Sequence, residues 1–225
     1  TRGWFYTLLN VATLLGKKAP YKNVISLGHI LDKKGQKMSK SKGNIVNPWD
    51  MIKKYGIDAL RWYFYTASAP GDPKKFDERD LANKYKGFIM TLWNSFVLFD
   101  TYVEKTRLGM PKMDELKPLN RWILSHLDRV TIKVTDALDA HDITDAGRAL
   151  EEFVINDFSQ WYLRRSRYAL QHPENKKEYE VTAQVTGNAL LRLAILSAPF
   201  IPFVSEMVYQ ELRKKMQLKP SSVHL

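Results

Sequence analysis

The chain has 225 residues, enough for one large domain or two modest ones, and 44% of them are apolar, which supports a hydrophobic core and argues against disorder. It has no cysteine, which excludes disulfides and cysteine-ligated zinc and is compatible with a reducing, cytoplasmic location. Of its net charge of +11, most sits in residues 1–50, where nine Lys and Arg face two Asp and Glu. Such a field attracts polyphosphates or a nucleic-acid backbone.

The N-terminal quarter predicts a helix, a strand and a loop. Apolar residues at helical spacing predict a helix over 2–15 that stops at Gly16. Residues 23–31 are rich in Val, Ile and Leu, and we expect a buried strand there. A turn signal over 32–35 then leads into a loop over 36–43.

Two short helices are expected next. The first has Asn47 as its cap and ends near Gly56, and the second has Asp58 as its cap and ends near Ala67. The Pro- and Gly-rich stretch over 69–73 ends this part of the chain.

Beyond that break, the apolar spacing is helical to the end of the chain. We expect Thr144 to cap a long helix with Leu150, Phe153, Val154, Phe158 and Trp161 on one face. The other expected segments are a helix over 85–103, a linker over 109–118, a helix around 123–138, a turn over 172–175, helices over 177–197 and about 202–216, and a loose tail from Leu218. Together they predict an antiparallel helical bundle.

One short run carries the chemistry. Lys37-Met38-Ser39-Lys40-Ser41 is followed by Lys42, Gly43 and Asn44. Ammonium groups and hydroxyls bind phosphate oxygens, and a glycine lets backbone N–H groups approach closely. A lysine-rich run by itself is more often a solvated surface. The order of these residues, after a strand and a Gly turn, instead favours a polyphosphate grip.

The ordered run resembles the KMSKS loop of the class I aminoacyl-tRNA synthetases. Further segments resemble the isoleucyl-tRNA synthetases within that class, and together they span essentially the whole chain. These segments are 2–8, 47–50, 55–63, 92–94, 161–167 and 198–203. The Arg-Gly-Trp-Phe opening at residues 2–5 favours the isoleucyl family over the valyl and leucyl ones.

The resemblance implies that an amino-acid carboxylate attacks the α-phosphorus of ATP, which releases pyrophosphate. Lys37 and Lys40 would be the catalytic residues, because they can stabilise the charge that builds on the pyrophosphate. Met38, Ser39 and Ser41 would complete the ATP site, with Met38 as a packing anchor. We expect Mg²⁺ to accompany the phosphates, and no metal or zinc ligand from this chain.

The resemblance also implies a pocket for the isoleucine side chain lined by Trp4, although a tryptophan alone is more often a core residue. The class requires a second motif, His-Ile-Gly-His, which this chain lacks, and Gly28-His29-Ile30 stands in the wrong place to replace it. The first residue is Thr1, not a methionine. We therefore expect a fragment of a longer protein that is inactive alone.

Trp161, Arg164, Arg165 and Arg167 are the candidate RNA contacts. On a helix, Arg164 and Arg165 lie one turn beyond Trp161. Arginines beside an aromatic ring can hold phosphates and stack unpaired bases. The alternative is a core tryptophan whose neighbouring arginines pair with Glu151, Glu152 or Asp157, and the resemblance favours RNA.

These observations predict a mainly α fold: the C-terminal remnant of a Rossmann-type catalytic domain followed by the bundle, which in the family binds the anticodon. We expect a catalytic part with stem-contact helices over 1–67, a connecting helix and linker over 68–115, and the anticodon-binding domain over 116–225. The implied partners are tRNA(Ile), ATP and isoleucine, with no membrane and a monomeric state. The alternatives are a valyl-tRNA synthetase fragment and a non-catalytic tRNA-binding helical module.

Overall fold

The computed structural model describes residues 3–103, 109 and 111–225, and nearly all of its regular structure is helical. The elements, in chain order, are α1 (Trp4–Leu14), β1 (Ile30–Leu31), the 3₁₀-helix η1 (Lys40–Lys42), α2 (Pro48–Tyr55), α3 (Ile57–Thr66), β2 (Lys74–Lys75), α4 (Glu78–Lys84), the π-helix η2 (Tyr85–Ile89), α5 (Met90–Tyr102), the 3₁₀-helix η3 (Met113–Glu115), α6 (Pro118–Asp139), α7 (Ile143–Glu152), the π-helix η4 (Phe153–Leu163), α8 (Arg164–Gln171), α9 (Lys176–Ser197) and α10 (Pro202–Met216). The predicted linker over 109–118 lies partly outside the described residues.

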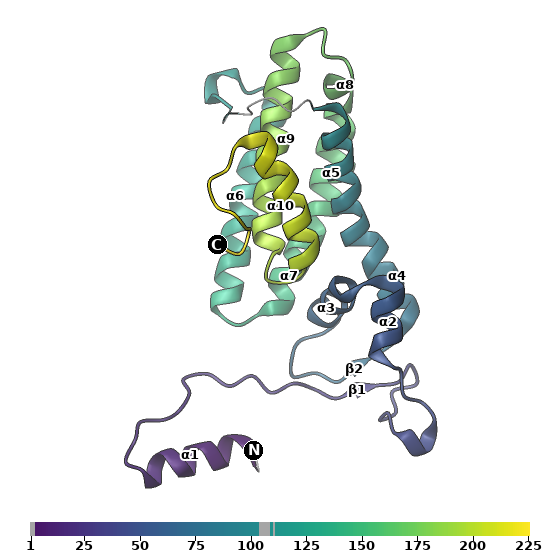
Figure 1. Ribbon diagram of the computed structural model, residues 1–225, viewed down its shortest axis with the longest axis vertical. Coiled ribbons are helices and arrows are strands. Elements are labelled where there is room, and N and C mark those ends of the chain that lie inside the picture. Colours follow the sequence, from purple (N-terminus) through teal and green to yellow (C-terminus); the bar gives the residue numbers. More distant parts are fainter. Residues whose placement is uncertain (1–2, 104–108, 110) are drawn as a thin grey trace.

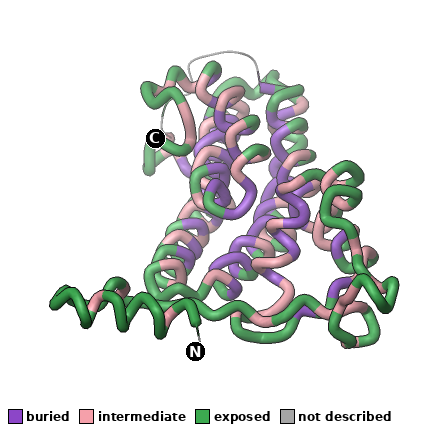
Figure 2. The backbone as a smooth tube through the Cα atoms, turned by 60° about the horizontal axis from the view of Figure 1, so that its bottom comes forward, coloured by how far each residue is buried: buried purple, intermediate pink, exposed green. Residues whose placement is uncertain are grey.

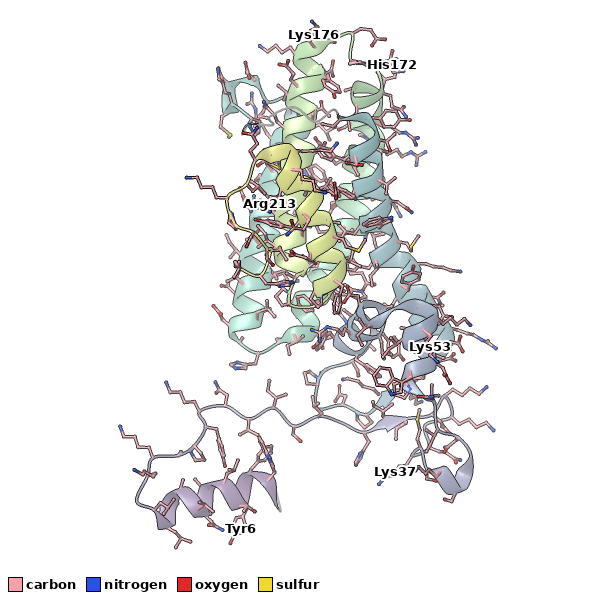
Figure 3. The ribbon with its side chains drawn as sticks, in the orientation of Figure 1. Tyr6, Lys37, Lys53, His172, Lys176 and Arg213 are labelled. Carbon is pink, nitrogen blue, oxygen red and sulfur yellow. The ribbon has the colours of Figure 1, made fainter. Side chains whose placement is uncertain are left out.

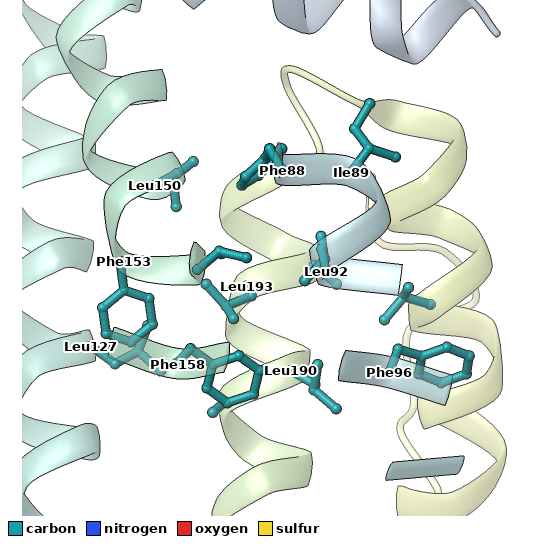
Figure 4. Close-up of a cluster of buried hydrophobic side chains, with 14 of the residues drawn as sticks. Phe88, Ile89, Leu92, Phe96, Leu127, Leu150, Phe153, Phe158, Leu190 and Leu193 are labelled. Carbon is teal, nitrogen blue, oxygen red and sulfur yellow. The ribbon is translucent and has the colours of Figure 1, made fainter. Parts of the chain in front are cut away.

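The long helices form the bundle in the upper part of Figure 1, which confirms the predicted fold class. Close packing joins α6 to α7 and α9, α9 to α10, and α5 to η4. Figure 4 shows part of the apolar core between them, which includes Phe88, Leu92, Phe96, Leu127, Leu150, Phe153, Phe158, Leu190 and Leu193. The stripe expected over 123–138 contributes Ile123, Leu127, Val130 and Val134 to this core.

The N-terminal segment differs from the prediction. None of the residues of α1 is buried, and residues 17–27, which lead from α1 toward β1, are exposed except for the half-buried Tyr21 (Figures 1 and 2). Only Ile30 and Leu31 form a strand, paired in parallel with Lys74 and Lys75. The expected buried strand over 23–31 is therefore wrong, because a strand is buried by neighbours and the described residues offer β1 a two-residue partner.

Two predicted helix caps are also wrong, whereas Asn47 is confirmed as a cap, since its side chain accepts a hydrogen bond from the Trp49 N–H at 3.1 Å. Asp58 lies inside the first turn of α3, and Gly56, with φ 83°, precedes that helix. Thr144 lies inside α7, whose cap is Asp142. Asp58 and Thr144 instead bind distant backbone groups, which local pattern cannot reveal.

The tail beyond α10 is not loose. The Tyr209 hydroxyl donates to the Pro220 carbonyl at 3.0 Å, and the Glu206 carboxylate accepts from the Ser222 hydroxyl and the Val223 N–H at 3.0 and 2.9 Å. These bonds fold the last residues back onto α10.

The helix α3 joins the lower part of the molecule to the bundle. Trp62 is fully buried and stacks on Phe88 of η2, with ring centroids 3.7 Å apart and planes within 6°. Phe200 packs edge-on against the same indole at 5.6 Å. One continuous apolar core therefore runs from α3 into the bundle.

Charged side chains of α3 bind the backbone where α9 gives way to α10. The Asp58 carboxylate accepts a hydrogen bond from the Val204 N–H at 2.7 Å, in the first turn of α10. The Arg61 guanidinium donates to the carbonyls of Pro199 and Phe200 at 2.8 and 2.9 Å. Each charge meets unpaired backbone groups of the opposite polarity at a helix end.

The bundle binds α3 in return. Arg148 of α7 donates to the Thr66 and Ala67 carbonyls at the end of α3, both at 3.0 Å. The Thr144 hydroxyl donates to the Ser68 carbonyl at 3.0 Å. With Asp58 and Arg61 these contacts make a joint, here called the α3 joint, that fixes α3 against the bundle from both ends.

The α3 joint predicts that Gly147→Ala is destabilising. A Cβ at Gly147 would lie 2.8 Å from the Thr66 methyl group and 3.5 Å from the Phe200 ring, so the chain must shift at a cost of about 1–3 kcal/mol. In the matched control Gly87→Ala, the nearest atom is the Ile155 methyl group at 3.8 Å, and we expect no loss. Urea denaturation measures both; equal stabilities would contradict the close packing.

The α3 joint also predicts a pH dependence at Asp58. Burial raises the pKa of this carboxyl above its ordinary value of 3.8, and the Val204 N–H opposes the rise. The folded state therefore holds the proton more tightly than the unfolded chain, so the free energy of unfolding falls as the pH rises from 3.8 through the raised pKa.

Asp58→Asn keeps an acceptor for the Val204 N–H and removes the buried charge, so we expect stability at pH 7 to be equal or higher and the acidic pH dependence to flatten. Asp58→Ala leaves that N–H without its partner and should lose about 1–3 kcal/mol. Thermal melting of both variants from pH 4 to 8 checks this; a stable alanine variant would show that the hydrogen bond contributes little.

Candidate functional site

The lysine-rich run forms an exposed loop at the lower end of the molecule, where Figure 3 labels Lys37. Lys37 pairs with Leu31 in an isolated antiparallel bridge, and the chain then turns through the 3₁₀-helix η1, which ends at Gly43 with φ 62°. Lys37 and Lys40 are exposed, and among the described residues neither forms an ion pair. Their ammonium groups are available to a ligand.

The other members of the run support the loop. Met38 is half-buried against the edge of the apolar core, as expected of a packing anchor. The Ser39 and Ser41 hydroxyls lie 3.2 Å apart and share a hydrogen bond. The backbone N–H of Ser39 donates to the side-chain oxygen of Asn44 at 2.9 Å. The run therefore exposes Lys37 and Lys40 to solvent, while hydrogen bonds of its serines stabilise its shape.

Asp32 and Asn44, for which the sequence predicted no role of their own, hold the base of the loop. The Asn44 amide donates to the Asp32 carboxylate at 2.8 Å, and that carboxylate also accepts from the N–H groups of Lys34 and Gln36 at 2.9 and 2.8 Å. These hydrogen bonds, with that of Asn44 the strongest contributor, lower the pKa of Asp32. An Asp before a Gly turn and an Asn after the run's Gly are the signal that could have revealed the pair.

Backbone bonds and one tyrosine attach the loop to the α3 joint. The Lys74 N–H donates to the His29 carbonyl at 2.9 Å and the Phe76 N–H to the Leu31 carbonyl at 2.8 Å. The Tyr63 hydroxyl of α3 donates to the Lys75 carbonyl at 2.7 Å. The position of the loop is thus set by β1, that of β1 by its pairing with β2, and that of β2 by its hydrogen bond to α3.

Trp4 is not brought to the loop. It lies on α1 with 72% of its surface exposed, and Figure 1 shows α1 on the opposite side of the lower part from the loop. The described residues place no enclosed pocket around it, and its role in an amino-acid pocket stays a prediction.

The candidate RNA residues come together at the other end of the molecule. Arg164, Arg165 and Arg167 are exposed, and 48% of Trp161 is exposed although it was expected on the apolar face with Phe158. The reason is the π-helix η4, whose i→i+5 pattern widens the turn. The next buried aromatic residue after Phe158 is therefore Tyr162, and the centroids of these two rings lie 6.0 Å apart.

Two stacked pairs follow one another along this face, here called the stacking stripe. The Arg165 guanidinium carbon lies 3.2 Å from the centre of the Trp161 indole, and its N–H donates to the Trp161 carbonyl at 3.4 Å. The Tyr168 ring stacks on the His172 ring with centroids 4.1 Å apart. Steps of 4, 3 and 4 residues put all four on one side of η4 and α8. Sequence reasoning missed Tyr168 and His172, although the same spacing could have found them.

Two of the three acids considered as partners for the arginines, Glu151 and Asp157, lie beside other basic groups. Glu151 pairs with Lys84 at 2.5 Å, and Asp157 lies 3.6 Å from His126. In the described part of the chain, no ion pair involves Arg164, Arg165 or Arg167. Figure 3 shows His172, at the end of the stacking stripe, and Lys37 at opposite ends of the long axis.

Two further properties concern metals and membranes. Over residues 3–103 and 111–225, no three His, Cys, Asp or Glu side chains gather where they could hold a metal ion. In the same residues, no helix has both the length and the apolar character needed to cross a membrane.

Two family models match the chain. Residues 1–76 match the tRNA synthetases of class I (I, L, M and V), and residues 120–225 match the anticodon-binding domain of tRNA ligase.

Curated relatives match the whole chain. The isoleucine–tRNA ligases of Thermus thermophilus and Deinococcus radiodurans are 41% and 42% identical to it, and that of Dehalococcoides mccartyi strain CBDB1 is 43% identical. The matched region is the whole of this chain and 21–22% of each relative. The chain therefore spans about a fifth of the length of these relatives.

Solved structures share the fold. A ternary complex of Agrobacterium radiobacter K84 agnB2 LeuRS with tRNA and LeuAMS superposes with a TM-score of 0.66 at 19% identity, over 96% of this chain and 26% of that one. Mycobacterium tuberculosis methionyl-tRNA synthetase in complex with methionyl-adenylate gives 0.67 at 18% identity, over 86% and 42%.

Proposed function

We propose, from the premise that this chain belongs to the isoleucyl-tRNA synthetases of class I, that it supplies one part of the ATP site and a tRNA-binding surface to a ligase that joins isoleucine to tRNA(Ile). The observation that carries the proposal is a loop tied to a helical bundle on which Lys37 and Lys40 are exposed and form no ion pair with any described residue. The relatives are named for isoleucine, which favours that amino acid over valine.

In this proposal, ATP lies over the lysine loop with its β- and γ-phosphates toward Lys37 and Lys40. As the isoleucine carboxylate attacks the α-phosphorus, the bond to the leaving pyrophosphate breaks and negative charge builds there. Lys40, in the first position of η1, meets that charge, and Lys37 supports it from the bridge with Leu31. The Ser39 and Ser41 hydroxyls can turn from each other toward a phosphate oxygen.

Mg²⁺ would enter with the phosphates, whose charge it would neutralise. The carboxylate nearest the run in the sequence, Asp32, accepts three hydrogen bonds within the loop, which favours a structural role for it over ligation of the ion. The proposal therefore gives this chain the cationic contacts and leaves the ion to the nucleotide.

The stacking stripe is the proposed tRNA contact. Trp161 and Tyr168 present aromatic faces, and Arg164, Arg165 and Arg167 supply charge that no described acid neutralises. Single-stranded RNA binds such surfaces through base stacking and phosphate contacts. The separation of the stripe from the lysine loop suits a long RNA that touches the chain at both ends.

The division of the chain into 1–67, 68–115 and 116–225 remains a proposal. The family matches over 1–76 and 120–225 support the outer two parts. The packing of α5 against η4 and α9 connects the middle part to the bundle. A monomeric state and a cytoplasmic location are likewise proposed.

The first test uses ATP–pyrophosphate exchange with isoleucine. In the full-length ligase that contains this chain, Lys40→Ala should lower kcat roughly 10²–10³-fold, the range for removing one preorganised charge contact. The control Lys86→Ala changes an exposed lysine of η2 and should leave exchange intact. The 225-residue chain alone should give only background exchange, and robust isoleucine-dependent exchange from it would overturn the proposal that it holds only part of the site.

The second test measures tRNA(Ile) binding by the 225-residue chain at several salt concentrations. Arg164→Glu with Arg165→Glu should weaken binding and flatten its salt dependence, because fewer counterions are released. Arg129→Glu, an exposed arginine of α6, is the matched control. Equal losses from both would indicate bulk charge attraction and count against a local RNA surface.

A further inference from the structure

The two ends of the lysine loop are held together by one side chain. The Asn44 amide donates to Asp32 at the start of the loop, at 2.8 Å, and its oxygen accepts from the Ser39 N–H inside the loop, at 2.9 Å. A longer contact, at 3.4 Å, reaches the Lys37 carbonyl. Asn44 thus uses both its donor and its acceptor to connect the entry, the middle and the exit of the loop.

Asp32 completes this clamp from the other side. One of its carboxylate oxygens accepts from the Lys34 and Gln36 N–H groups, which shapes the turn at Gly35, and the other oxygen accepts from Asn44. The Asp32 N–H also donates to the Gln36 carbonyl at 2.8 Å. Both oxygens are therefore occupied, and the carboxylate acts as the point where the turn and the loop end are joined.

The loop needs such a clamp because its own charges oppose it. Five lysines, Lys33, Lys34, Lys37, Lys40 and Lys42, lie between Asp32 and Asn44, and no acid lies among them. Like charges this close repel one another and favour an open loop. Gly35 and Gly43, with φ of 78° and 62°, leave the backbone free to open at both sides.

We propose that Asp32 and Asn44 are positioning residues for the adenylation step, forming a clamp that keeps Lys37 and Lys40 together in the geometry that receives the pyrophosphate. They touch neither the nucleotide nor the reacting atoms; they act through the loop. This inference rests on the proposed function of the loop.

A reciprocal exchange of the two side chains tests the clamp. In Asp32→Asn the side-chain oxygen at position 32 is needed by the turn, so its NH₂ group faces the NH₂ group of Asn44. In Asn44→Asp two carboxylate oxygens face each other. Each single variant therefore breaks the central hydrogen bond. In the double variant D32N/N44D, the new amide at position 32 donates to the new carboxylate at position 44. The turn N–H groups and the Ser39 N–H keep their acceptors, and the net charge is unchanged.

In the full-length ligase, each single variant should lower kcat of isoleucine-dependent exchange roughly ten- to hundredfold, as expected for slight misplacement of catalytic groups, with the KM for isoleucine unchanged. The double variant should recover most of the loss. Asn175→Asp, at the cap of α9, is the matched control and should have no effect. Singles with normal kcat, or a double variant as impaired as the singles, would overturn the proposal.

A second readout needs no activity. In the 225-residue chain, trypsin should cut after Lys37, Lys40 and Lys42 several-fold faster in the single variants than in the wild type, and the double variant should return to the wild-type rate. Thermal melting should be unchanged, because the clamp lies outside the apolar core. If the wild-type ligase shows no isoleucine-dependent exchange, the proposed function fails, while the cleavage rates still decide whether the clamp exists.

Discussion

The burial of α3 against the bundle is the constraint on which the rest of the structure depends. Trp62 fills the space between Phe88 and Phe200, and close packing leaves little freedom to shift it. Asp58, Arg61 and Arg148 then bind backbone groups at three helix ends. Apolar packing holds α3 against the bundle. The charged groups fix the orientation of α3, because their hydrogen bonds all form together in only one orientation.

A short series of hydrogen bonds fixes the position of the lysine loop relative to α3. Tyr63 holds β2, β2 holds β1, and β1 leads directly into Asp32. No large core stabilises the loop, so hydrogen bonds within it determine its shape. The stacking stripe is built differently, on a rigid helix whose inner side is buried. The lysine loop, shaped by its own hydrogen bonds, and the stacking stripe, built on a helix with a buried inner side, thus occupy the two ends of one connected body.

Local patterns in the sequence predicted much of this molecule. Helical spacing located α1, α9 and α10 to within two residues and identified the buried face of α6, and Asn47 and Pro48 marked the start of α2. The prediction of a buried strand over 23–31 was wrong because apolar composition indicates only a tendency to be buried. Burial itself requires neighbouring elements that cover the strand. Trp161 left the apolar face because η4 is a π-helix, and a 3.6-residue period does not describe its turns.

The sequence by itself determined the helical character, the bundle and the ordered lysine run, since spacing and motif order are properties of neighbouring residues. Only the tertiary structure decided what Asp58 and Thr144 do, because their partners, Val204 and Ser68, lie 146 and 76 residues away. A short polar side chain can cap its own helix or bind a distant backbone group with similar energy, and the packing of α3 selects between them.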